Sequence, residues 1–408
     1  MPSAQPADLD ADIVVIGAGI VGICAATFLA EAGKRVLVVD RTGICEETSS
    51  GNASAFAFSD VLPLAHKGMM RNLPRWLSAP LGPLSIPPAY LPRLLPWLYR
   101  FWRAGSKANY ERALAAQVCL MKLAESEWMG LMDRSGTRPM LREDGVLELY
   151  ESEAEFQATL PGWHARERSG IDFRHVGREA LPEFQPGLSP RFVKGTFVPS
   201  WKTVSNPQDL GKAVWRYAEG KGARFIRASV KEATPGGKGA VIVLEDGRTV
   251  EAARLLVAAG AWSHRLARNF GDRVPLETER GYNTTFPASA FDIRRPLENA
   301  VRVGGAVELG GLQLPPNYRR SQAMVEKAKA FLPGFDAREG REWMGYRPSM
   351  PDSVPVIGTS PKHPFVFYAF GHGHLGLTQA AATARLVRDL VLGRDAAIDL
   401  KPFSVQRF

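Results

Sequence analysis

Residues Ile13 to Asp40 read IVVIGAGIVGICAATFLAEAGKRVLVVD, and this stretch decides the fold. Its first four residues are apolar and have the length of a buried strand. The pattern Gly17-Ala18-Gly19-Ile20-Val21-Gly22 follows directly, and a helical pattern then runs to Ala32, before Gly33. A second apolar run, residues 35–39, ends on Asp40. Strand, glycine turn, helix, strand and terminal acid together predict a dinucleotide-binding βαβ unit.

The glycines and the acid of this unit each have a physical role in holding a dinucleotide. Gly17 permits the tight turn, Gly19 lets the backbone approach a pyrophosphate, and Gly22 lets the helix pack close to the strand. The free N–H groups at the helix N-terminus attract the phosphates, and Asp40 is placed to bind ribose hydroxyls. The contacts expected from this unit are Gly17, Gly19, Ile20, Val21, Gly22, Asp40 and Arg41.

Composition places the chain among ordinary globular proteins. With 408 residues, two domains are the default expectation. The three cysteines, Cys24, Cys45 and Cys119, form no C-x-x-C pair and no metal-ligand spacing. We therefore expect a cytoplasmic protein without disulfides and without a metal site. The net charge of +9 fits nucleic acid, an anionic membrane or an anionic substrate, but no nucleic-acid-binding motif accompanies it, so nucleic acid is not an expected partner.

Residues 61–110, which we call the basic aromatic segment, contain no acidic residue. Lysines, arginines, tryptophans and tyrosines alternate there with eight prolines. Such residues are typical of a bilayer interface, so one interpretation is a segment that docks on anionic lipid without spanning it. In the other interpretation, the aromatic side chains pack against the protein and the arginines are solvated.

Two later stretches repeat the strand-to-glycine pattern. Residues 254–259 lead into Gly260, and residues 365–370 lead into Gly371-His372-Gly373-His374-Leu375-Gly376-Leu377-Thr378 before a helix over 379–392. A loop of small and hydroxyl residues, 47–55, follows Asp40 and suits a backbone lying against a cofactor. We therefore predict one Rossmann-like α/β domain assembled from separated segments.

The rest of the chain predicts an α+β substrate domain with a mainly antiparallel sheet. Helices are predicted over 106–134, over 152–168 with a break at Pro161, and over 322–331, and a turn-rich loop is predicted over 180–187. Strands are predicted over 145–150, 279–286, 300–304 and 307–310. The predicted cofactor-domain segments are 1–62, 201–275 and 345–408, and the predicted substrate-domain segments are 63–200 and 276–344.

Taken together, these blocks resemble the FAD-dependent amine oxidase superfamily of D-amino-acid oxidase type, and within it bacterial D-amino-acid dehydrogenases. The resemblance covers nearly the whole chain. Its marks are Gly17–Gly22, Asp40, Thr48-Ser49, Asn52-Ala53, Gly145–Leu149, Ala259–Ser263, Arg280–Tyr282, Gly345–Pro348, Pro351-Asp352, Pro355–Gly358 and Gly371–Gly376. It implies FAD as the cofactor. The further cofactor contacts it implies are Thr48, Ser49, Asn52, Ala53, Val230, Ala259, Gly260, Trp262, Gly373, Leu375, Gly376, Leu377 and Thr378.

The resemblance also implies a reaction: a hydride leaves the Cα atom of a D-amino acid, the imine hydrolyses, and the electrons pass to a quinone or carrier. D-Proline or hydroxyproline is one expected substrate. Arg347 is expected to bind the substrate carboxylate, and Tyr282 to be a lid, a second carboxylate partner or a core residue. His374 stands where some relatives carry arginine, so it is expected to donate a weaker hydrogen bond or to pack. The alternatives are an oxygen-using glycine or sarcosine oxidase and a non-catalytic flavin-binding module at a membrane surface.

Overall fold

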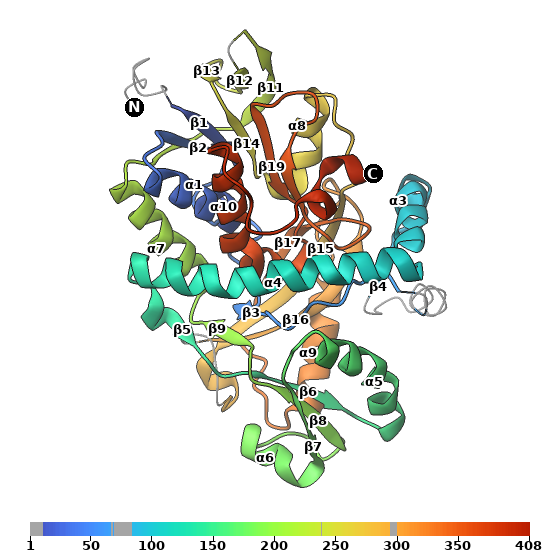
Figure 1. The fold of residues 1–408 in the computed structure, drawn as a ribbon. Coiled ribbons are helices and arrows are strands. Elements are labelled where there is room, and N and C mark those ends of the chain that lie inside the picture. The colour runs from blue at the N-terminus through green and yellow to red at the C-terminus, as the bar shows by residue number, and fades with distance from the viewer. Residues whose placement is uncertain (1–10, 67, 69–83, 238, 294–299) are drawn as a thin grey trace.

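A six-stranded sheet carries the predicted dinucleotide unit in the computed structural model of the chain, which describes residues 11–66, 68, 84–237, 239–293 and 300–408 (Figure 1). Its strand order is β10-β2-β1-β14-β19-β18, parallel except for the last pair. The bounds are β1 Ile13–Ile16, β2 Val36–Asp40, β10 Arg224–Arg227, β14 Leu255–Val257, β18 Val356–Thr359 and β19 Val366–Phe370. Three distant parts of the chain therefore build one sheet, as the sequence predicts.

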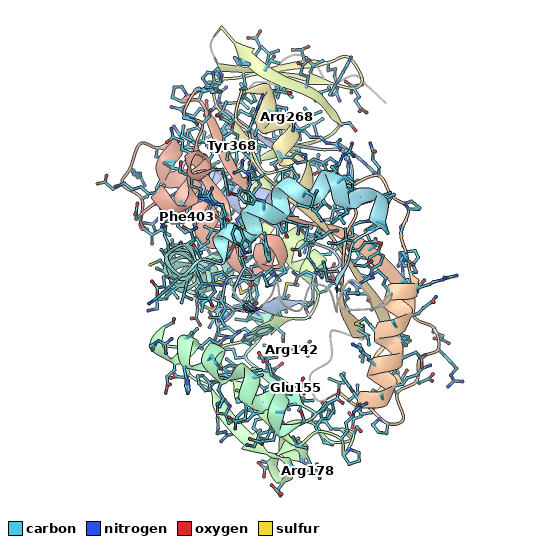
Figure 2. The ribbon with its side chains drawn as sticks, turned by 90° about the vertical axis from the view of Figure 1, so that its right-hand side faces the viewer. Arg142, Glu155, Arg178, Arg268, Tyr368 and Phe403 are labelled. Carbon is cyan, nitrogen blue, oxygen red and sulfur yellow. The ribbon has the colours of Figure 1, made fainter. Side chains whose placement is uncertain are left out.

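Both faces of this sheet are covered, which explains why its strands are apolar throughout. Ile13 and Val15 face a core shared with helices α1 (Ile20–Glu31), α4 (Lys107–Ser135), α7 (Pro207–Gly220) and α10 (Gly376–Val391). Val14 and Ile16 face the opposite core, with α8 (Ser263–Asn269) and a small antiparallel sheet of β11 (Val230–Gly236), β12 (Gly239–Leu244) and β13 (Thr249–Ala252). On that side Tyr368, labelled in Figure 2, donates a hydrogen bond to Asp272 at 2.7 Å.

A second, four-stranded sheet has the order β17-β15-β16-β4. In Figure 1, β17 and β15 are labelled above the long helix α4 and β16 below it. The strands of this sheet are β17 Arg341–Ser349, β15 Glu277–Pro287, β16 Ala300–Leu309 and β4 Leu84–Ser85, with α9 (Arg319–Phe331) packed on it. The first three strands are antiparallel. Two three-stranded sheets complete the substrate side. One has the order β3 (Ala55–Phe56)-β9 (Lys202–Val204)-β5 (Leu141–Arg142), and the other has the order β6 (Val146–Tyr150)-β8 (Lys194–Val198)-β7 (Arg174–Gly177).

Three local predictions were wrong. Helix α5 (Glu153–Arg168) passes through Pro161 without a break, because Pro161 is exposed while Phe156 and Trp163 are buried on the other side and hold the helix in place. The two strands predicted over 300–310 form the single strand β16, since a register shift at Tyr282 and Asn283 accommodates its glycines. The stretch predicted as a loop over 180–187 contains the short helix α6 (Leu181–Phe184), anchored by the buried side chain of Leu181.

The described part of the basic aromatic segment contains β4 and helix α3 (Leu91–Ala104). Residues 1–10 of the first predicted cofactor-domain segment, and residues 67 and 69–83 of the basic aromatic segment, lie outside the described residues. In α3, Leu94 and Trp97 are buried against Leu309, whereas Leu95, Tyr99 and Trp102 are 55%, 58% and 58% exposed. Each interpretation of the segment therefore fits one face of α3. Within the described ranges, no helix is both long and apolar enough to cross a bilayer.

Candidate functional site

A cavity of about 1040 Å³ lies between the two large sheets. The carboxyl ends of β1, β2, β14 and β19 open into it from one side, and side chains of β15, β16 and β17 line it from the other. Ligands of open α/β sheets bind at this edge. All of the predicted cofactor-binding and catalytic residues line the cavity except Gly22, which packs behind the glycine turn.

Two of the three glycines in the turn after β1 have no room for a side chain. Gly17 has φ +113°, and a Cβ atom there would lie 2.4 Å from the carbonyl oxygen of Ala258, just after β14. A Cβ atom on Gly22 would lie 2.0 Å from the carbonyl oxygen of Gly17. At Gly19 the nearest atom is Ser49 Oγ at 3.5 Å, so this position faces open space. The geometry of the turn thus has the tight packing expected at Gly17 and Gly22, and the role of Gly19 at a pyrophosphate stays a prediction.

The side chains of Asp40 and Ser49 hold this turn in place by accepting hydrogen bonds from its backbone amides. Asp40 Oδ2 accepts a hydrogen bond from the Ala18 amide at 2.9 Å, and Oδ1 accepts one from the Thr42 amide at 2.8 Å. Ser49 Oγ accepts from the Ile20 amide at 3.0 Å. Sequence reasoning assigned Asp40 to ribose binding alone and missed this second role. Gly19 offers helix α1 no side-chain cap, so apart from the Ile20 amide, which Ser49 already takes, the start of the helix stays available to an anion.

The other predicted cofactor contacts surround the same space. Arg41 stacks over the ring of Trp262, with 4.0 Å from its guanidinium carbon to the ring centroid. Thr48 Oγ1 donates to the Tyr346 carbonyl at 2.9 Å, which ties the small-residue loop to β17. The buried Oδ1 atom of Asn52 has no partner among the described residues. An unsatisfied acceptor at a cavity wall is the kind of group that a bound ligand satisfies.

Arg347 is the candidate substrate-binding group. Its side chain lines the cavity, and it makes no hydrogen bond or ion pair with any described residue. Burial lowers the pKa of Arg347, and the charge of Glu279, directly opposite on β15, counteracts this effect. A Cβ atom on Gly281 would lie 2.6 Å from Arg347 Nη2, so Gly281 makes room for the guanidinium. A half-buried guanidinium that has no partner among the described residues is suited to a carboxylate ligand.

Tyr282 is held by partners of its own. Its hydroxyl donates to Glu308 Oε2 at 2.6 Å and accepts from the Asn317 amide at 3.1 Å. Arg280 Nη1 also donates to Glu308, at 2.6 Å. Burial raises the pKa of Tyr282 to about 12, and the Glu308 carboxylate adds to the shift. Tyr282 lines the cavity, but its hydroxyl would have to leave Glu308 before it could donate a hydrogen bond to a ligand.

His374 faces the cavity together with a residue that sequence reasoning missed. Its Nε2 atom lies 3.0 Å from Asp60 Oδ2, and Asp60 also lines the cavity. Asp60 is the last acidic residue before the acid-free segment 61–110, and this position was the only signal for it. The neighbouring His372 is buried against Thr383, and burial lowers its pKa to about 3. In the described residues, no three His, Cys, Asp or Glu side chains gather in a way that could hold a metal ion.

Comparisons with known proteins agree with this geometry. The family model DAO, described as "FAD dependent oxidoreductase", matches residues 12–390. The chain is 33% identical to a D-amino-acid oxidase from Bradyrhizobium diazoefficiens, over 97% of this chain and 98% of the relative. It is 30% identical to a D-amino acid dehydrogenase from Rhizobium johnstonii, over 97% of this chain and 99% of the relative. The crystal structure of glycine oxidase from Geobacillus kaustophilus shares the fold, with a TM-score of 0.73 at 21% identity over 98% of this chain and 99% of that one.

Proposed function

The chain belongs to the DAO family of FAD-dependent oxidoreductases, and we propose that it oxidises a D-amino acid and passes the electrons to a quinone or protein carrier. The named relatives support an amino acid substrate, since one is a D-amino-acid oxidase and the other a D-amino acid dehydrogenase. The observation that carries the proposal is the position of Arg347. Its guanidinium has no partner among the described residues, and it lines the same cavity as the predicted dinucleotide-binding turn.

The residues present fit FAD. The glycine turn and the start of α1 would hold the pyrophosphate, and Asp40 the adenosine ribose. Asn52 offers a buried acceptor that lacks a partner among the described residues. The start of α10, at Gly376, lines the cavity without a side-chain cap, so its first amides would suit the edge of the flavin that gains negative charge. When bound, FAD supplies the acceptor for the two electrons of the substrate.

The protein's own contribution is mainly to bind and orient. Arg347 would take the α-carboxylate in a bidentate pair, which fixes the position of the substrate Cα. Arg347 is half-buried in the wall that β15, β16 and β17 form, so this pair is stronger than it would be in open solution. The imine product hydrolyses to a 2-oxo acid and ammonia, or opens if it is cyclic, without further help from the protein.

Gly281→Ala tests whether the position of Arg347 matters. The new methyl group would meet the flexible end of Arg347 rather than backbone, so we expect the fold and FAD content to be retained while the guanidinium moves. The KM for the substrate should rise by about 10-fold or more, because even a displacement of about 1 Å weakens an oriented pair. Steady-state kinetics and a thermal melt measure both effects. An unchanged KM would contradict the placement of the carboxylate at Arg347.

An anaerobic substrate panel tests the function itself. D-Amino acids, including D-proline and hydroxyproline, should bleach the flavin absorbance, whereas their L-forms should not. Failure of every amino acid to bleach it would contradict the proposal and favour the non-catalytic alternative.

The second candidate is an oxygen-using oxidase of glycine or sarcosine type, favoured by the fold shared with glycine oxidase. Stoichiometric hydrogen peroxide during aerobic turnover would decide for it, and fast reduction of a dye or quinone instead of oxygen would decide against it.

We further propose that the outer face of α3 contacts anionic lipid on the cytoplasmic side of the membrane. Leu95, Tyr99 and Trp102 are exposed there beside Arg93, Arg100 and Arg103, with no acidic residue in the helix. Each arginine near an anionic surface contributes about 1 kcal/mol, and exposed apolar side chains add burial in the interface. The three cysteines are free, which fits a reducing compartment.

Replacing Leu95, Tyr99 and Trp102 together with serine should weaken binding to vesicles that contain phosphatidylserine by about 10-fold or more, without loss of flavin. Co-sedimentation with vesicles measures the binding. The matched control replaces Leu314, an exposed leucine outside α3, with serine, and should leave the binding unchanged. Unchanged sedimentation of the triple variant would show that this face does not bind lipid.

A further inference from the structure

A charged pair stands beside Arg347 at the substrate end of the cavity. Strand β17 meets the loop after β19 at an antiparallel bridge between Ser349 and His372. Arg347 lies two residues before Ser349, and His374 lies two residues after His372. Because the bridge is antiparallel, both residues lie on the same side of it, so both side chains belong to one end of the cavity. His374 is 38% exposed and its partner Asp60 is 26% exposed, and both line this cavity.

The pair fixes which nitrogen of His374 is free. Because an ionised carboxylate only accepts hydrogen bonds, the Nε2 atom of His374 must carry the proton that Asp60 Oδ2 accepts at 3.0 Å. In the neutral ring, Nδ1 then bears the lone pair. Nδ1 has no hydrogen bond to any described residue. A carboxylate that orients an imidazole in this way is a common arrangement for a general base.

Charged groups from several elements act on this pair. Arg166 on α5 lies 3.7 Å from Asp60 Oδ1, and Glu148 on β6 also lies near Asp60. Glu279 on β15 and Arg347 on β17 face His374 with opposite charges. Burial lowers the pKa of His374, but the hydrogen bond and charge of Asp60 and the charge of Glu279 outweigh it, so the pKa lies above its ordinary value. Burial raises the pKa of Asp60, yet His374 and Arg166 hold it below its ordinary value.

We propose that His374 Nδ1 accepts a proton from the α-ammonium group of the substrate, with Asp60 as its positioning residue; this rests on the proposed function. An α-ammonium has no lone pair and cannot form a C=N bond. After its N–H proton moves to His374, the amine lone pair forms that bond while the Cα–H bond breaks and its electron pair reduces the bound FAD. His374 then returns the proton to water. The amine and the carboxylate held by Arg347 are attached to the same carbon, which places the two tasks side by side.

The test measures the anaerobic rate constant of flavin reduction at saturating D-amino acid against pH. In the unaltered protein it should rise with pH as His374 becomes neutral. His374→Gln should lower it by about 10²- to 10⁴-fold, and the loss should shrink at a pH where the substrate amine deprotonates by itself. Asp60→Asn removes a charge that raises the pKa of His374, so the rising limb should move to lower pH. His164→Gln, on the exposed side of α5, is the matched control.

A second measurement does not depend on turnover. In protein with ¹³C-labelled histidine, the resonance lost in His374→Gln identifies His374. Its titration midpoint should lie above that of an ordinary histidine and fall in Asp60→Asn. His374 is not the base if His374→Gln and Asp60→Asn keep the pH dependence of flavin reduction seen in the unaltered protein. The same holds if the two variants lower the rate by an equal factor at every pH. If the unaltered protein is not reduced by any D-amino acid at any pH, the proposed function fails first, and the role of His374 fails with it.

Discussion

Replacing Arg347 with glutamine is expected to lower kcat/KM for the amino acid substrate by about 10²- to 10³-fold. Leaving one partner of a buried charge pair alone costs about 3–5 kcal/mol, and each 1.36 kcal/mol is about tenfold in rate. Most of the loss should appear in KM, because the pair forms when the substrate binds. Arg347→Lys should recover little, since an ammonium group cannot make the bidentate pair. Stopped-flow reduction at several substrate concentrations separates binding from the reaction itself.

The control for this prediction is Arg341→Gln, which removes an exposed arginine from the other end of the same strand, β17. This variant should have the same KM, flavin content and melting temperature as the unaltered protein. Substrates without a carboxylate provide a further check: if an amine of matching shape reduces the flavin as fast as the amino acid does in the unaltered protein, Arg347 does not bind a carboxylate. Equal loss of activity in Arg347→Gln and Arg341→Gln would indicate a general effect of charge instead.

The sequence predicts the cofactor sheet well because its signals are local. Residues 13–40 contain a strand, turn, helix and strand in succession, and each element depends on its own neighbours. The contact between Asp40 and the Ala18 amide could not be predicted, because side-chain hydrogen bonds within a turn leave no periodic pattern. The same holds for Pro161, whose effect on α5 depends on which side of the helix is buried.

The candidate site is harder to predict because its residues are far apart in the chain. Asp60 and His374 are brought together by the packing of the β3 region against the start of α10, where the Ala57 amide donates to Thr378 Oγ1 at 3.0 Å. Arg347 was identified only through its family motif, since an arginine in a strand is more often solvated or paired. What marks it in the structure is its lack of a partner among the described residues, and sequence cannot show that.

Gly22→Ala is expected to abolish FAD binding while leaving a folded, destabilised protein. The added Cβ atom would lie 2.0 Å from the Gly17 carbonyl oxygen, which is backbone and is fixed by the hydrogen bond from the Gly17 amide to the Val39 carbonyl. Helix α1 must therefore move away from the turn, and its free amides move with it. Overpacking of this kind costs about 1–3 kcal/mol of stability. The ratio of flavin to protein absorbance after gel filtration should fall to a small fraction of the unaltered value.

Gly33→Ala separates this effect from a simple loss of stability. Gly33 has φ +77° at the other end of α1, and no atom lies within 4 Å of the position that a Cβ atom would take, so alanine there adds backbone strain without a clash. The strain costs about 1–2 kcal/mol, similar to the cost at Gly22. Since only Gly22 lies beside the phosphate-binding turn, Gly33→Ala should melt at a lower temperature yet keep its flavin. If both variants lose flavin to the same degree, stability rather than the position of the α1 N-terminus controls FAD binding.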